Sequence, residues 1–224
     1  MNLYLLPISA VVLGFFVVKL SKSTAIKNIK LLLAFSGAFL LSLTVFDLLP
    51  EVYEHLEVKK TGLFIMIGIL LQVILEFFSK GAEHGHIHIH KHSTVFPWLL
   101  FASLCFHAFL EGFPIHHHND MVYGVLIHKI PIAILITSYL YQSDFKSLHI
   151  FVFLILFGLM TPLGTFISNT TDILTDYLYL INAVVIGIFL HISTTILFES
   201  SEGHKFNLSK IIVIIVAVAV AYFM

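Results

Sequence analysis

Arginine is absent from this 224-residue chain, and charged residues of any kind make up only 11% of it. All 12 basic residues are lysines, and the formal net charge of −1 gives no indication of nucleic-acid binding. An average soluble domain has about 25% charged residues. A chain this poor in charge cannot cover a soluble surface, so its apolar surface is expected to face lipid. An ordinary soluble globular protein is therefore excluded.

Cysteine is almost absent as well. Cys105 is the only one, and it lies within an apolar run. No intrachain disulfide can form, so cysteine usage does not indicate the redox compartment of the chain.

Long apolar runs take the place of these missing residues. Hydrophobic residues make up 58% of the chain, and its mean hydropathy is +0.99. A helix needs about 20 mostly apolar residues to cross a bilayer. Such runs lie near residues 2–20, 31–50, 62–79, 96–115, 121–141, 148–168, 173–198 and 208–224. The predicted fold is all-α integral membrane, with one transmembrane domain over residues 1–224 that forms an eight-transmembrane-helix bundle. If the last run lies on the surface, because Lys210 interrupts it, seven spans are left.

The lysines predict how these helices cross the membrane. No charged side chain precedes residues 2–20 and several lysines follow them, which indicates a retained first helix rather than a signal peptide. With eight spans, nine lysines fall on the cytoplasmic side: Lys19, Lys22, Lys27, Lys30, Lys80, Lys91, Lys146, Lys205 and Lys210. Only Lys59 and Lys60 fall outside, which is a positive-inside asymmetry. Both termini are therefore predicted to lie outside the cell (inner) membrane.

Three ionisable side chains within the predicted spans carry the strongest functional signal. His107 and Glu111 are four residues apart in the fourth span, so they face one side of a helix, and His128 lies in the fifth. A charged group at bilayer depth costs roughly 3 kcal/mol or more and usually marks function. Two imidazoles and a carboxylate suit Zn²⁺ and similar transition metals better than Mg²⁺ or Ca²⁺. These residues are predicted to bind metal; a structural polar cluster is the alternative.

Pro131 follows His128 by three residues. Proline removes a backbone donor and loosens the preceding helical turn. Broken helices at mid-membrane often line the substrate site of a transporter. A broken, proline-containing helix pair is therefore expected at the metal site.

Further ionisable residues lie near the ends of other spans. Asp47 and Glu51, near the outer end of the second span, are either an outer ion entrance or interface residues. His191 in the seventh span and Glu199 at its inner end are candidate pathway residues. A single histidine within a membrane span is usually a hydrogen-bonded packing group, and this is the favoured interpretation of His191 by itself. Glu76, late in the third span, stands alone in the sequence.

A histidine tract occupies the predicted cytoplasmic loop at residues 80–94. Its histidines recur at every second position: His84, His86, His88, His90 and His92. Such tracts are typical of metal binding, and this one is placed to take zinc from the inner mouth of the pathway or to sense its level. A solvated loop without a role is the alternative. A second run, His116, His117 and His118, lies at the predicted outer end of the fourth span and fits either ion capture or a passive interface.

The segment His107-Ala-Phe-Leu-Glu111-Gly112, together with His128-Lys129-Ile130-Pro131, resembles the helix-four and helix-five motifs of the ZIP (Zrt-/Irt-like) family of divalent metal transporters. Leu48-Leu49-Pro50-Glu51 is similar to the end of that family's helix two, and Glu199–His204 to the end of its helix seven. The resemblance covers nearly the whole chain. It implies eight helices, outside termini, a His-rich cytoplasmic loop after helix three, and a metal site on the histidines and the glutamate of the first two motifs.

The chain departs from the family pattern at several of these positions. Ala108 replaces the usual second ligand after the helix-four histidine, and Ile132 stands where a helix-five glutamate is expected. Lys129 stands where some members carry a metal-binding side chain. The resemblance therefore implies that a second, adjacent metal position is absent here. Lys129 is predicted either to supply the missing positive charge beside Glu111 or to turn away and snorkel.

The resemblance implies uptake of divalent metal ions by alternating access. Zn²⁺ is the first expectation, and Fe²⁺, Mn²⁺ and Cd²⁺ are alternatives that ligand type separates only weakly. The expected partners are the ion and the lipid bilayer, and a homodimer is left open. Rival interpretations are a membrane-embedded metal-dependent hydrolase, a zinc exporter outside the ZIP family and a non-transporting metal sensor. No H-E-x-x-H motif occurs, so a transporter rather than an enzyme is predicted.

Overall fold

Helices account for almost all of the residues that the computed structural model describes, which are 4–21, 28–79, 81, 96–116, 119–143, 145–171, 177–199 and 208–224. In chain order they are α1 (Leu5–Ser21), α2 (Ile29–Leu43), α3 (Leu49–His55), α4 (Val58–Ser79), α5 (Trp98–Leu110), α6 (Asn119–Gln142), α7 (Ser147–Thr170), α8 (Leu178–Glu199) and α9 (Leu208–Tyr222). A π-helical segment, η1 (Thr44–Leu48), joins α2 to α3, and a 3-10 helix, η2 (Phe113–His116), follows α5. Apolar runs form helices because hydrocarbon offers the backbone no other hydrogen-bond partner.

Within the described residues, six helical segments are long and apolar enough to cross a membrane. They are Ile29–His55, Val58–Ser79, Trp98–Ile115, Asp120–Gln142, Ser147–Thr170 and Leu178–Phe198. The helices α1 and α9 are apolar but shorter, with 17 and 15 residues. The all-α membrane class is therefore confirmed, while the crossing of the bilayer by α1 and α9 stays a prediction.

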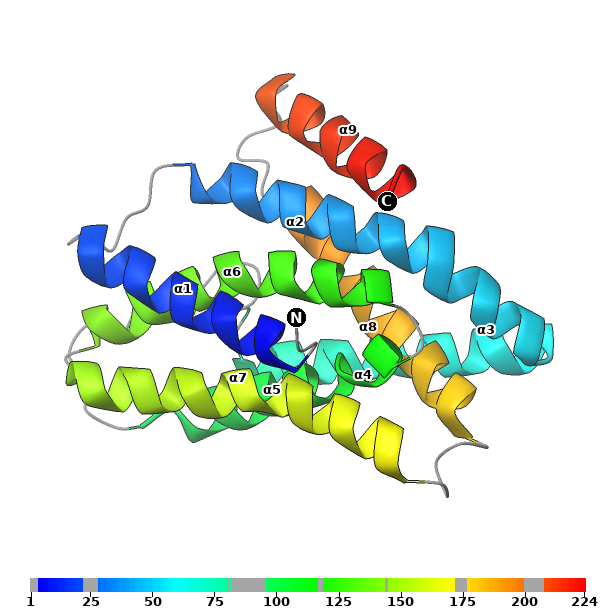
Figure 1. The fold of residues 1–224 in the computed structure, drawn as a ribbon, viewed down its shortest axis with the longest axis horizontal. Coiled ribbons are helices and arrows are strands. Elements are labelled where there is room, and N and C mark those ends of the chain that lie inside the picture. Colours follow the sequence, from blue (N-terminus) through cyan, green and yellow to red (C-terminus); the bar gives the residue numbers. More distant parts are fainter. Residues whose placement is uncertain are drawn as a thin grey trace.

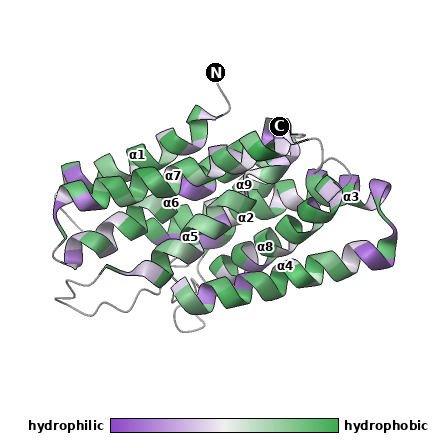
Figure 2. Ribbon diagram, turned by 90° about the horizontal axis from the view of Figure 1, so that it is seen from below, coloured by the Kyte–Doolittle hydropathy of each residue, from purple (hydrophilic) through white to green (hydrophobic). Residues whose placement is uncertain are grey.

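The helices lie side by side along the longest axis of the molecule, and α8 crosses the others obliquely (Figure 1). The helix α1 packs against α6 and α7, α5 packs against α7, α4 packs against α8, and α9 covers α2 from the outside. Most helical residues are hydrophobic, and hydrophilic residues gather at α3 and at helix ends (Figure 2). Many of the large hydrophobic side chains are exposed. This distribution suits a bundle whose outer surface faces lipid.

Glycines allow α4 and α8 to approach each other closely. A Cβ atom on Gly68 would overlap the backbone carbonyl of Val184, and one on Gly187 would overlap that of Ile65. Membrane helices commonly use small residues in this way, because association in lipid depends on close packing rather than on burial from water. This contact holds α8, which carries His191, against α4.

The helix α6 runs through Pro131 without interruption, so the predicted break at this proline is not observed. Loss of one backbone hydrogen bond at a proline is tolerated in membrane helices when neighbours adjust. Of the two helices that carry the predicted metal site, it is α5 that ends there: it stops at Leu110, and Glu111 is its C-cap. The irregular backbone thus lies beside the glutamate of the predicted metal site.

Candidate metal centre

His107 and Glu111 lie on one face of α5, and both are buried. Their exposed fractions are 3% and 1%, and His107 Nε2 lies 3.4 Å from Glu111 Oε2. The spacing of four residues brings the side chains together locally, since it places them one helical turn apart. The last turn of α5 is closed by a hydrogen bond from the Glu111 N–H to the His107 carbonyl at 3.1 Å. The predicted pair of His107 and Glu111 is therefore formed by the C-terminal end of α5 alone.

Residues of α6 complete the cluster from the other side. His128 and Lys129 are 2% and 1% exposed. The rings of His107 and His128 meet edge to face, with their centroids 6.4 Å apart. The sequence-predicted trio is thus gathered in one buried region of the bundle.

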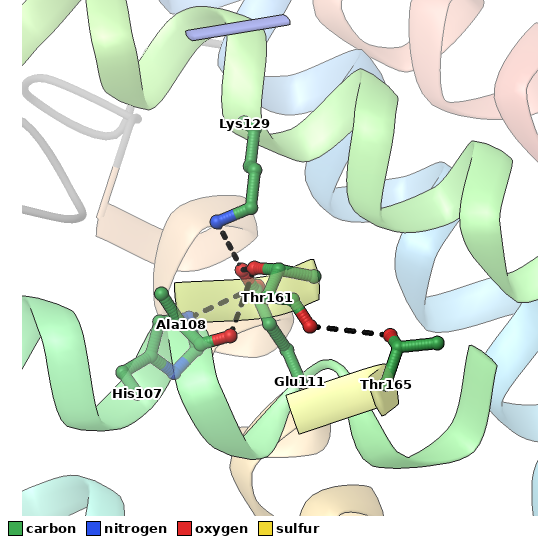
Figure 3. Close-up of polar contacts among 6 residues, drawn as sticks. All are labelled: His107, Ala108, Glu111, Lys129, Thr161 and Thr165. Atoms are coloured by element: carbon green, nitrogen blue, oxygen red, sulfur yellow. Dashed lines mark hydrogen bonds and ion pairs between the residues drawn. The ribbon is translucent and has the colours of Figure 1, made fainter. Parts of the chain in front are cut away.

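The two carboxylate oxygens of Glu111 have different partners (Figure 3). Oε1 is ion-paired with the Lys129 ammonium and accepts a hydrogen bond from Thr161 Oγ1 at 2.9 Å. Oε2 faces His107. Lys129 also lies 4.4 Å from the centroid of the Phe157 ring, a cation–π distance. Lys129 therefore points into the bundle and does not snorkel.

The helix α7 supplies two residues that the sequence interpretation missed. The Thr161 hydroxyl shares its one hydrogen between the Ala108 carbonyl at 2.8 Å and Glu111 Oε1, and Thr165 Oγ1 donates to the Gly112 carbonyl at 2.8 Å. Both threonines are buried. Their spacing of four residues within an apolar span was the available signal, but a threonine in a helix usually bonds its own backbone, so the signal was weak.

Two glycines bring α5 and α7 close enough for these bonds. A Cβ atom on Gly112 would overlap the Thr161 carbonyl, and one on Gly164 would overlap the Phe109 carbonyl. The short glycine contact sets the distance at which Thr161 reaches Glu111. The position of the carboxylate therefore depends on the packing of α7 as well as on α5.

Replacing Thr161 with valine is expected to destabilise the protein by about 1–3 kcal/mol, because a buried carboxylate and a carbonyl lose a donor. The matched control is Thr137→Val, since Thr137 Oγ1 is also buried but, within the described residues, donates to the Ala133 carbonyl of its own helix and to no other helix. Thermal unfolding of each purified variant in detergent measures the loss of stability. Thr161→Ser keeps the donor and should recover most of the loss. An equal loss of stability in the two valine variants would show that the hydrogen bonds from Thr161 to the neighbouring helix stabilise the protein no more than a bond within one helix.

The cluster is not closed around one ion in this conformation. Among the residues that the structure describes, no group of three His, Cys, Asp or Glu side chains is placed to hold a metal together. The cation nearest to Glu111 is instead the ammonium of Lys129. His107 and Glu111 can approach one ion with little movement, whereas His128 has to move closer to join them.

Glu76 and His191, far apart in the sequence, form a second polar pair. His191 Nε2 lies 2.6 Å from Glu76 Oε2, between α8 and α4, and both side chains are partly exposed. The expectation that Glu76 stands alone is therefore wrong, because the close packing of α4 and α8 brings the two residues together. His191 is hydrogen-bonded, as the packing interpretation expects, but its partner is the ionisable carboxyl group of Glu76.

Asp47 and Glu51 lie on the continuous rod formed by α2, η1 and α3. Asp47 falls in the π-helical segment, Glu51 lies in the first turn of α3, and both are partly exposed. Short π-helical insertions occur frequently at functional sites. The structure thus places these two carboxylates at an irregular part of the helix.

Several predicted site residues lie outside the described part of the chain. These are the loop histidines His84, His86, His88, His90 and His92, the pair His117 and His118, and the side chains of His116 and Glu199. Their assignments therefore stay predictions.

Residues 79–224 match the family model described as ZIP Zinc transporter, a range that contains His107, Glu111, His128 and Lys129. A stretch of 90 residues is 30% identical to Zinc transporter ZIP1 of Danio rerio. That stretch covers 38% of this chain and 30% of the zebrafish protein. The chain therefore spans less than a third of the length of this relative.

Proposed function

This chain belongs to the ZIP zinc transporter family, whose model matches residues 79–224, and from this premise we propose that it carries divalent metal ions, Zn²⁺ first, across the cell membrane. The observation that carries the proposal is the buried His107–Glu111 pair facing His128 inside an apolar bundle. Such groups are costly at bilayer depth unless they interact with a charge. The similarity to a zebrafish zinc transporter supports zinc as the substrate.

In the proposed binding step, the ion replaces part of its water shell with His107, Glu111 and His128. Glu111 offers the Oε2 atom, because Oε1 is held by Lys129 and Thr161. His128 then closes on the ion from α6. A carboxylate with one oxygen already engaged by an ammonium binds a dication less strongly than a free one, since like charges repel. The site therefore favours release as well as binding, as transport requires.

Lys129 takes the place of a second metal ion in this proposal. Its ammonium lies against Glu111 and neutralises that carboxylate. Some members of the family carry a metal-binding side chain at the position of Lys129. Lysine is fixed to α6 and cannot be transported. We therefore propose one transported ion per site rather than two.

Polar groups at two other places extend the proposed pathway. Asp47 and Glu51 form the outer entrance, and the Glu76–His191 pair lies toward the inner end of α4, where an ion leaving the centre would meet it. The bundle alternates between access from the two sides, and the histidines at residues 80–94 receive the ion in the cytoplasm. A partly exposed acid–imidazole pair suits transient zinc binding.

The proposed orientation places both termini outside the cell (inner) membrane, with eight spans and transport inward. Fe²⁺, Mn²⁺ and Cd²⁺ remain alternative substrates, since nitrogen and oxygen ligands bind all of them. A second copy of the chain is a further proposed partner. The ligands act on the ion as cargo, so transport and not catalysis is the proposed activity.

Reconstitution of the full chain into liposomes with a trapped zinc indicator tests the proposal. Wild-type protein is expected to give zinc uptake above that of protein-free liposomes, and His107→Ala should lower the initial rate by at least about tenfold, because a ligand is lost. Fe²⁺, Mn²⁺ and Cd²⁺ added outside should compete, whereas Mg²⁺ should not.

Lys59→Met is the control, since Lys59 is exposed in the first turn of α4 and belongs to no proposed binding site. It should transport at the wild-type rate. A wild-type rate of zinc uptake in His107→Ala would contradict the proposed metal site. Liposomes that contain the wild-type protein but take up no divalent metal would contradict the proposed function.

A further inference from the structure

A groove opens between the first turns of α5 and α7. In the predicted topology these helix starts lie on the cytoplasmic side, whereas Asp47 and Glu51 lie near the outer side. The volume of the groove is about 630 Å³. We call it the α5–α7 groove, and its apolar lining includes Phe96, Trp98, Phe101, Leu148, Val152 and Leu156. Aromatic rings form its floor: Phe101 and Phe153 pack with centroids 4.8 Å apart, and Phe96 lies 5.8 Å from Phe153. A groove of this size can hold part of a lipid-sized ligand.

Two basic side chains belong to the same groove. Lys146 and His149 line it, and both are exposed. No acidic residue lies in the first turn of α7. Within the part of the chain that the structure describes, neither Lys146 nor His149 forms an ion pair. An apolar cavity with basic groups at its edge therefore fits a ligand that is anionic at one end and hydrophobic at the other.

The groove lies at the level expected for lipid headgroups. The helices α5 and α7 both begin there, and the lysine asymmetry predicts that these ends face the cytoplasm. Trp98, 68% exposed, stands at the start of α5, where tryptophans mark the membrane interface. The positive ends of two helix dipoles add to the attraction of an anion.

We propose that the α5–α7 groove binds an anionic phospholipid of the cytoplasmic leaflet. The phosphate contacts Lys146 and His149, and an acyl chain lies along Phe101, Val152 and Leu156. A zwitterionic lipid fits less well, because its own cation faces a basic rim. A metal ion fits poorly, because the lining contains one imidazole and no carboxylate. The lipid then contacts the two helices that hold Glu111 and Thr161 further along.

Native mass spectrometry of the purified full chain tests the proposal. The protein is offered phosphatidylglycerol and phosphatidylcholine with identical acyl chains. Wild-type protein should retain phosphatidylglycerol preferentially, and Lys146→Gln should reduce that preference about fivefold, since one basic residue near a membrane surface contributes about this much. Lys146→Gln combined with His149→Gln should reduce it further. Lys19→Gln, an equal charge change at an exposed position on the same predicted side, should leave the preference intact.

A second variant tests the groove without changing charge. Val152→Trp fills the cavity and should reduce retention of both lipids, whereas Leu163→Trp, at an exposed position further along α7, should not. Excess inorganic phosphate should not displace the lipid, because the acyl chain contributes to binding. Equal retention of both lipids by wild-type protein, or an unchanged preference after removal of Lys146 and His149, would overturn the proposal.

Discussion

Glu111→Gln is expected to reduce metal uptake to the background of protein-free liposomes and to destabilise the protein at the same time. The substitution removes the carboxylate of the proposed site and leaves the buried Lys129 ammonium without its counter-charge. Breaking a buried ion pair by removal of one partner costs roughly 3–5 kcal/mol. For a protein of this size, the unfolding temperature should fall by roughly 10 °C. Thermal unfolding in detergent and liposome uptake measure the two effects separately.

Combining Glu111→Gln with Lys129→Met separates stability from transport. Each single substitution leaves one buried charge unpaired, but the double variant has neither charge, so it should recover much of the lost stability. Uptake should not return, because the carboxylate ligand is still missing. Lys59→Met is the control for lysine removal, since Lys59 is exposed, and it should change neither quantity. Additive losses in the double variant would show that Glu111 and Lys129 do not pair in the membrane.

Gly164→Ala is expected to disrupt the centre from a neighbouring helix. The new methyl group would meet the Phe109 carbonyl, so α7 has to move away from α5 and Thr161 is drawn away from Glu111. Overpacking of a close contact typically costs about 1–3 kcal/mol. The unfolding temperature and the initial rate of zinc uptake should both fall.

Gly62→Ala provides the matched control for this glycine substitution. Gly62 also lies within a helix, but among the described residues no atom of another helix lies within 4 Å of a Cβ added there. Alanine favours helix relative to glycine, so this variant should be as stable as the wild type or slightly more stable. Loss of uptake in Gly164→Ala without loss in Gly62→Ala would tie the effect to the contact between α5 and α7. Normal uptake and stability in Gly164→Ala would show that this contact can relax without cost.

The helical membrane class could be predicted because it depends on local composition. Apolar runs of sufficient length become helices in lipid wherever they occur, and each expected run does contain a helix. The pairing of His107 with Glu111 was equally local, since four residues make one helical turn. The interruption expected at Pro131 was not found, because a proline removes one hydrogen bond but its surroundings decide whether the helix breaks.

By itself, then, the sequence determined the apolar helices, the buried ionisable residues and the spacing that joins His107 to Glu111. Only the tertiary structure decided that Lys129 turns inward, that Thr161 reaches Glu111 from α7, and that Glu76 meets His191. The physical reason is that a contact between helices depends on how each helix is rotated and how closely it packs. Glycine contacts and neighbouring side chains set that rotation and distance. Thr161 and Glu111 are 50 residues apart in the sequence, and Glu76 and His191 are 115 apart, so no local pattern links them.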